Sequence, residues 1–181
     1  MEEKRECFGK YVNSSSVCYE CCDEAVCIER TYDIKREPKK TYIRPTKNDY
    51  YLDIALSVSK RSNCLKRHYG CIIVKNDEII ATGYNGSPRG EQNCCDKGYC
   101  QRLNKEHNSG DYSDCFSVHA EQNAMLSASR KDMIGSTMYL SCEENGIEVF
   151  ESSPCPICEK LIKNSGIEMV VNKNGIVWER K

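Results

Sequence analysis

One histidine, one glutamate and two cysteines stand in this chain at spacings that suit hydrolysis at a metal ion. His119 and Glu121 are separated by one residue, and Cys155 and Cys158 by two, with a proline directly before Cys155. One imidazole and two thiolates supply three zinc ligands, and the fourth tetrahedral position then stays open for water. Zinc lowers the pKa of such a water from roughly 16 to about 7. We therefore predict a catalytic zinc held by His119, Cys155 and Cys158.

Glu121 lies two residues after the first ligand, where its carboxylate can move protons without binding the metal. We expect it to take a proton from the water, to deliver it to a ring nitrogen and then to help protonate a departing amine. The order His-x-Glu and then Pro-Cys-x-x-Cys is the known signature of zinc-dependent nucleobase deaminases. The alternative is a structural zinc site that a fourth cysteine closes, with Glu121 as an ordinary charge at a helix start. The two motifs together favour catalysis by zinc-bound hydroxide.

The elements that must position these side chains alternate between helix and strand patterns, which predicts an α/β fold. Helices are expected from Thr46 to about Arg61, from His119 to about Ala128, and from Cys155 to about Gly166. Strands are expected at 71–75 and 79–81, which form a hairpin, and at 138–140, 147–150, 167–171 and 176–178. Three glycines and a proline predict a loop over residues 82–90.

Composition narrows the class of protein. The 181 residues carry 26 Lys and Arg against 27 Asp and Glu, a net charge of −1, so global charge gives no reason to expect a nucleic acid polymer as a partner. The charged N-terminus has no apolar segment behind it, and no stretch is long enough to span a bilayer; we expect a cytoplasmic protein without a membrane partner. Fourteen cysteines then indicate metal ligands or buried side chains more than disulfides. Cys71 and Cys142 lie in strand-like runs and are expected in the core.

The first 41 residues are expected to form a separate, cysteine-rich N-terminal extension, and residues 42–181 the catalytic domain. The extension is poor in aliphatic residues and ends in a charged stretch. A further zinc is one hypothesis for it. Its ligands would come from Cys7, Cys18, Cys21 and Cys27, with Cys22 spare. A loosely ordered arm or a contact between subunits fits the composition equally well.

Three segments, at residues 61–67, 82–90 and 118–124, resemble those of the deoxycytidylate (dCMP) deaminases, within the zinc-dependent cytidine and deoxycytidylate deaminase superfamily. The resemblance extends over about residues 42–172. It implies a three-layer α/β/α fold around a mixed sheet of about five strands. It also implies hydrolysis of dCMP to dUMP and ammonia, which supplies dUMP for thymidylate synthesis. A homohexamer, activation by dCTP and inhibition by dTTP are common in the family and are implied as well.

The resemblance assigns Asn85 to contact with the substrate sugar. For the phosphate, the glycine-rich loop offers backbone N–H groups, and Arg89, Lys66 or Arg67 can add positive charge. The alternative for Arg89 is a solvated loop tip. Tyr84 can stack on a base, but packing is the more common use of a single aromatic side chain. We predict Asn85 and Arg89 as substrate-binding residues.

Relatives in this family often carry a second, structural zinc. The predicted ligands are Cys64, Cys94, Cys100 and Cys115. His107 competes with the last two, and Cys95 competes with its neighbour Cys94. Such a site would order the polar segment after the loop, because structural zinc contributes roughly 10–16 kcal/mol of apparent binding free energy. The alternative is a set of ordinary buried cysteines.

Two rival functions stay open on the sequence. One is another deaminase of the same superfamily, acting on a free nucleoside, a modified nucleotide or a tRNA adenosine. A tRNA enzyme would show a basic face, and a nucleoside enzyme would not need a phosphate-binding loop. The other is a zinc-binding regulatory module without catalysis, which would have no use for the carboxylate of Glu121.

Overall fold

The computed structural model describes residues 43–107, 109–110, 112 and 114–180. Contacts divide the chain into two units, residues 1–44 and 45–181, and every helix and strand described below lies in the second. The boundary between residues 41 and 42 stays a prediction. The hypothetical zinc site of the N-terminal extension lies outside the described residues.

Six strands form one mixed sheet in the order β2-β1-β3-β5-β6, with β4 paired to β3. The strands are β1 (His68–Lys75), β2 (Glu78–Tyr84), β3 (Thr137–Glu144), β4 (Ile147–Glu148), β5 (Met169–Asn172) and β6 (Gly175–Glu179). β3 and β5 are parallel, and the other pairs are antiparallel. The predicted hairpin is confirmed as β1 and β2. The predicted strand at 147–150 ends two residues earlier.

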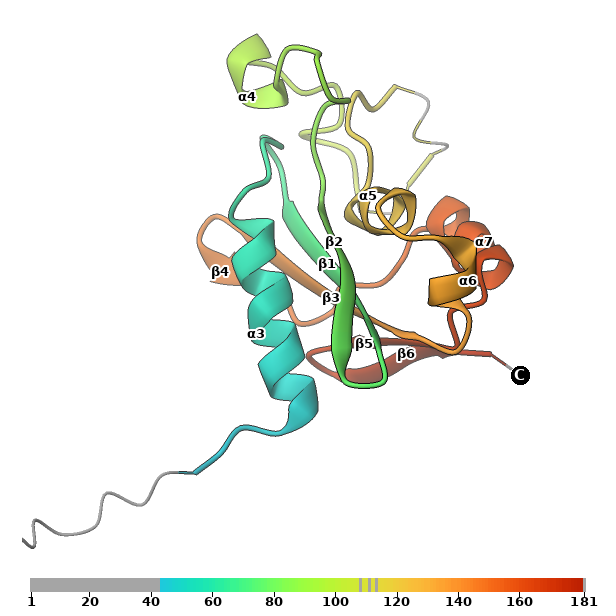
Figure 1. Cartoon of the computed structure of the whole chain (residues 1–181). Coiled ribbons are helices and arrows are strands. Elements are labelled where there is room, and N and C mark those ends of the chain that lie inside the picture. The colour runs from blue at the N-terminus through green and yellow to red at the C-terminus, as the bar shows by residue number, and fades with distance from the viewer. Residues whose placement is uncertain (1–42, 108, 111, 113, 181) are drawn as a thin grey trace, which may run out of the picture. The chain divides into compact units, whose positions relative to one another are not determined.

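Helices cover both faces of the sheet, as Figure 1 shows. Helix α3 (Lys47–Ser59) packs on one face, and α5 (Ala120–Leu126), α6 (Arg130–Met133) and α7 (Pro156–Ser165) pack on the other. The short helix α4 (Cys94–Lys97) belongs to the segment between β2 and α5. The predicted three-layer α/β/α fold is therefore confirmed. In the part of the chain that the structure describes, no helix has the length and apolar character needed to cross a membrane.

The strand β1 separates two cores because its successive side chains point to opposite faces. Cys71 and Ile73 pack with α5 and α7, whereas Ile72 and Val74 pack with α3. All four are 6% exposed or less, so the strand is apolar without a break. Cys71 and the fully buried Cys142 of β3 are confirmed as core residues.

Two glycines bring a helix onto the sheet from each side. A Cβ atom added at Gly83 in β2 would lie 2.3 Å from the backbone oxygen of Ala120 and 2.3 Å from the backbone nitrogen of Ala124, both in α5. One added at Gly70 in β1 would lie 1.9 Å from the backbone oxygen of Ala55 in α3. The prediction of a loop over residues 82–90 was therefore wrong for its first three residues. Gly83 is needed because the helix packs closely against the strand. From one sequence alone, a glycine of this kind cannot be told apart from a glycine in a turn.

Candidate metal centre and active site

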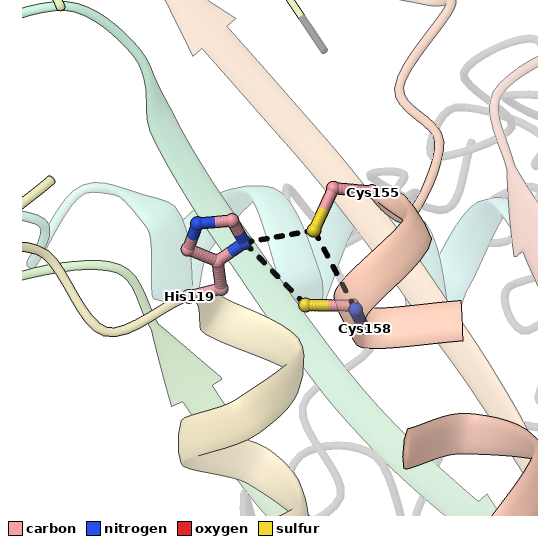
Figure 2. Close-up of side chains that lie close together, drawn as sticks. All are labelled: His119, Cys155 and Cys158. Carbon is pink, nitrogen blue, oxygen red and sulfur yellow. Dashed lines mark hydrogen bonds between the residues drawn. The ribbon is translucent and has the colours of Figure 1, made fainter. Parts of the chain in front are cut away.

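The side chains of His119, Cys155 and Cys158 meet at one point (Figure 2). His119 Nδ1 lies 3.4 Å from each of the two sulfur atoms, and the three ligand atoms lie within 4.8 Å of one another. Ligands at zinc bond lengths are separated by roughly 3.5–3.8 Å across a tetrahedron. Both the donor set and its spacing therefore fit zinc. Among the described residues, this is the one group of three or more histidine, cysteine or carboxylate side chains at such distances.

Two helix starts position these ligands. Cys155 is the N-cap of α7, its Sγ accepts a hydrogen bond from the backbone N of Cys158 at 3.5 Å, and Pro156 takes the first helical position. Proline suits that position because its fixed φ is helical and its missing N–H would have no partner there. His119 is the N-cap of α5, and its backbone N–H donates to Gln122 Oε1 at 3.0 Å. Since α5 and α7 pack on the same face of the sheet, their starts converge.

The pKa values of the two thiols and the imidazole depend on one another through the hydrogen bonds among them. The hydrogen bond with Cys158 lowers the pKa of the Cys155 thiol to about 4, and the same contact raises the pKa of Cys158. Burial opposes the imidazolium form of His119, but its hydrogen bond with Cys155 and the neighbouring negative charges outweigh burial and raise its pKa. Cys155 is thus already ionised at neutral pH. A cation that binds here therefore needs no proton from Cys155, but Cys158 and a protonated His119 each have to release one.

Glu121 is buried beside this group, with 4% of its surface exposed. Burial raises the pKa of its carboxyl, while a hydrogen bond from its own backbone N–H and the charge of His119 oppose that rise. Its oxygens do not belong to the ligand group, yet the side chain lines the same cavity. A carboxyl with raised proton affinity next to the metal position suits proton transfer. Glu121 therefore lies in the same cavity as His119 and Cys155, and its role in proton transfer stays a prediction.

A cavity opens in front of the metal ligands and carries basic residues on its wall. The lining includes His119, Glu121, Cys155, Lys66, Arg67 and Arg102. Arg67 pairs with Glu144 through its Nε at 2.9 Å, and Lys66 Nζ donates to the carbonyl oxygen of Arg102 at 3.1 Å. Arg102 lies in a polar segment without any periodic pattern, so nothing in the sequence distinguishes it from its neighbours.

The two predicted substrate-binding residues differ in their placement. Asn85 is 7% exposed and lines the cavity. Its Oδ1 accepts hydrogen bonds from Tyr69 N at 2.8 Å and Ser62 Oγ at 2.7 Å, and its Nδ2 donates to Arg67 O at 2.8 Å. The amide oxygen therefore accepts two hydrogen bonds from within the protein, and the amide nitrogen uses one of its two N–H groups in the same way. Arg89 is exposed and is absent from the lining, so the structure does not bring it to the cavity.

The predicted structural zinc site is only partly assembled. Cys64, Cys100 and Cys115 all line the cavity. Burial raises the pKa of Cys64, and the nearby thiols of Cys100 and Cys94 add to that rise. The four sulfur atoms do not come within 4.8 Å of one another as a group, so this site stays a prediction. Of the two competitors, Cys95 is exposed while Cys94 is buried, and the ring of His107 stacks on Tyr69 with centroids 6.0 Å apart.

Comparisons with known proteins agree with this geometry. Residues 45–173 match the family model of the cytidine and deoxycytidylate deaminase zinc-binding region. The chain is 40% identical over 129 residues to the deoxycytidylate deaminase of Schizosaccharomyces pombe, an alignment that covers 71% of this chain but 37% of that protein. It is 39% identical over 134 residues to the deoxycytidylate deaminase of Mycobacterium phage D29. That alignment covers 71% of this chain and 94% of the phage protein. This chain therefore spans little more than a third of the length of the yeast relative.

Among solved structures, one similar fold is the dCMP deaminase of the cyanophage S-TIM5 in complex with dCMP and dUMP. It has a TM-score of 0.51 and 30% sequence identity, and the match covers 72% of this chain and 82% of that chain.

Proposed function

Because this chain belongs to the cytidine and deoxycytidylate deaminase zinc-binding family, we propose that it hydrolyses dCMP to dUMP and ammonia. The observation that carries the proposal is the convergence of His119, Cys155 and Cys158 beside the buried Glu121 in one cavity. The named relatives support dCMP as the substrate, since those of Schizosaccharomyces pombe and phage D29 are deoxycytidylate deaminases and the cyanophage enzyme binds dCMP and dUMP.

In the proposed mechanism, His119 Nδ1 and the sulfur atoms of Cys155 and Cys158 hold the metal. Zinc, when bound, supplies a Lewis acid that makes water nucleophilic at neutral pH. Glu121 accepts a proton from the attacking water and delivers it to the ring nitrogen beside the carbon that carries the amine. It then moves the second proton of the attacking water to the amino group, so that the C–N bond breaks, ammonia leaves and a carbonyl remains. Burial of the carboxyl raises its proton affinity and so suits it to hold the proton between these steps.

We infer that Lys66 and Arg67 bind the substrate phosphate. Both line the cavity that also contains Glu121 and the metal ligands, whereas the exposed Arg89 does not. A guanidinium that pairs with phosphate gives a strong charge-assisted hydrogen bond. A phosphate subsite favours a nucleotide over a free nucleoside as substrate, which supports the deoxycytidylate assignment over a nucleoside deaminase.

The resemblance to deoxycytidylate deaminases supports three further proposals: a homohexamer, regulation by dCTP and dTTP, and a supply of dUMP for thymidylate synthesis in the cytoplasm. Sedimentation of the zinc-loaded protein measures the assembly. Activation by dCTP at low dCMP, reversed by dTTP, is the expected kinetic behaviour. Hyperbolic kinetics that dCTP leaves unchanged would contradict the regulatory proposal.

Ammonia release from dCMP, CMP, deoxycytidine and dCTP, measured together with zinc content, tests the main proposal. We expect dCMP to be the preferred substrate. Glu121→Gln keeps the size of the side chain but cannot take up a proton, so it should lower kcat by roughly 10²- to 10⁴-fold at unchanged zinc content. A zinc-loaded Glu121→Gln protein as active as the wild type would contradict the proton-transfer role. No ammonia from any cytosine nucleotide would contradict the function itself.

A further inference from the structure

A buried arginine holds together the segment between β2 and α5. Arg102 is 7% exposed, its Nη1 donates to Asp114 Oδ1 at 3.1 Å, and its Nη2 donates to the carbonyl oxygen of Ser109 at 2.5 Å. The Cζ atom of Arg102 also lies 3.9 Å from the centroid of the Tyr112 ring. A planar guanidinium can donate along its edges to a carboxylate and a carbonyl while its face lies on an aromatic ring.

Tyr112 connects this arginine to a metal ligand. Its ring centroid lies 5.0 Å from that of His119, and the two rings meet edge to face at 75°. The φ angle of Tyr112 is 63°, in the left-handed region that bulky residues rarely adopt. Such a backbone persists only where the surrounding contacts fix it. The contacts of Tyr112 with Arg102 on one side and His119 on the other can provide this constraint.

The orientation of the His119 ring decides whether a metal site exists. The imidazole can turn about its bond to Cβ, and Nδ1 faces the sulfur atoms of Cys155 and Cys158 in only part of that range. A ring packed against the imidazole restricts this rotation. Tyr112 and Arg102 lie with His119 in the wall of the same cavity. Residues that orient a metal-binding histidine typically change metal affinity by roughly 10–100-fold when they are replaced.

We propose that Arg102 and Tyr112 are positioning residues of the metal centre. Arg102 fixes the ring of Tyr112, and Tyr112 fixes the imidazole of His119 so that Nδ1 faces the two sulfur atoms. This inference rests on the proposed function only in requiring that His119 binds zinc. It is independent of the substrate. The polar segment between β2 and α5 thereby acquires a role in metal binding through residues that do not touch the metal.

Zinc affinity of the full-length protein, measured by competition with a chromophoric chelator, tests the proposal. Arg102→Met and Tyr112→Leu should lower the affinity roughly 10- to 100-fold. Tyr112→Phe keeps the ring and should bind zinc as the wild type does. Lys97→Met is the matched control: Lys97 Nζ lies 4.1 Å from the centroid of the Phe116 ring, so this variant removes a cation–π contact of the same segment that does not involve His119.

The absorption spectrum of the protein loaded with Co²⁺ provides a second measurement, because it reports the geometry of the ligands. Arg102→Met and Tyr112→Leu should change it, and Tyr112→Phe and Lys97→Met should not. Unchanged affinity and spectra in the first two variants would overturn the proposal. An equal loss in Lys97→Met would overturn it too, because it would show general loosening of the segment. A wild-type protein that binds zinc without deaminating dCMP would contradict the proposed function alone.

Discussion

Asn85 and Arg67 are joined by a hydrogen bond of 2.8 Å from the Asn85 amide to the Arg67 carbonyl oxygen. The same amide accepts a hydrogen bond from the backbone of Tyr69. Asn85 therefore fixes the backbone on both sides of His68, at the start of β1. It thereby also fixes the position of the Arg67 Cα atom. An asparagine expected to touch the substrate sugar thus also holds the backbone from which Arg67, a proposed phosphate ligand, enters the cavity wall.

Arg67→Ala tests the phosphate subsite. We expect it to raise KM for dCMP roughly 10- to 100-fold, because a hydrogen bond to a charged group contributes roughly 1.5–3 kcal/mol. Deoxycytidine has no phosphate, so its turnover should not change. Arg89→Ala is the control, since Arg89 is exposed and lies outside the cavity, and its KM should equal that of the wild type. Equal effects of Arg67→Ala on both substrates would argue against phosphate binding by this residue.

At the level of the elements, the packing of α5 on β2 sets the position of His119 and Glu121. Gly83→Ala puts a methyl group 2.3 Å from two backbone atoms of α5, and only movement of the helix or the strand relieves this. Overpacking typically costs about 1–3 kcal/mol, and here no side chain can yield. We expect a lower melting temperature and weaker zinc binding.

Gly98→Ala serves as a control for the substitution at Gly83. Gly98 has a positive φ of 69°, but nothing lies within 4 Å of an added Cβ. It should lower stability slightly through backbone strain and leave zinc affinity unchanged. Gly83→Ala protein with the zinc affinity and melting temperature of the wild type would contradict the packing argument.

The helix α3 is tied to the turn between β1 and β2 by a tyrosine. Tyr51 Oη donates to Asp77 Oδ1 at 2.7 Å, and this hydrogen bond, with burial, raises the pKa of Tyr51 to about 12. An unfolded tyrosine ionises near pH 10. The stabilisation is therefore complete below about pH 10 and is lost as the pH rises through about 12.

Tyr51→Phe lacks both the hydrogen bond and the ionisation. The free energy of unfolding should be lower in Tyr51→Phe than in the wild type at pH 8, and the difference should shrink between pH 10 and 12. Urea titrations at several pH values measure it. A difference that stays constant up to pH 12 would mean that Tyr51 does not titrate in this way.

For the whole molecule, every helix and strand that the structure describes and every residue of the proposed active site lie in the unit 45–181. We expect a chain that begins at Pro45 to fold, bind zinc and deaminate dCMP with a kcat/KM close to that of the full-length protein. One zinc fewer per chain than in the full-length protein would support a metal in the extension. A folded, zinc-loaded shorter chain without activity would show that residues 1–44 contribute to the site or its assembly.

The metal ligands could be predicted from the sequence because their information is local. The spacing of Cys155 and Cys158 on one helix turn needs no tertiary structure to be recognised, and neither does the pairing of a histidine with a glutamate two residues later. The continuous apolar run of β1 is local in the same sense. These features indicated the fold class correctly, and the three predicted metal ligands lie together in the structure.

Other features depend on contacts between distant segments. The sequence around Gly83 predicts a loop, because the helix that requires a glycine there, α5, lies about forty residues further along the chain. Arg67 and Arg89 are the same residue type, so the sequence does not tell which of them lines the cavity. The structure shows that Arg67 does and that Arg89 does not. Arg102 and Tyr112 belong to a segment with no periodicity, so the contact of Arg102 with Tyr112 and that of Tyr112 with His119 left no signal in the sequence.

Gly70 and Gly83 have a joint consequence for how sequences of this kind can diverge. They lie on neighbouring strands, where Gly70 pairs with Tyr84 and Cys71 with Gly83, and each receives the backbone of a different helix. At both positions the nearest helix atoms belong to the main chain, so a smaller neighbouring side chain cannot make room for an added methyl group. Homologues that keep this separation of the layers must retain glycine at both positions, even where the nucleotide they act on has changed.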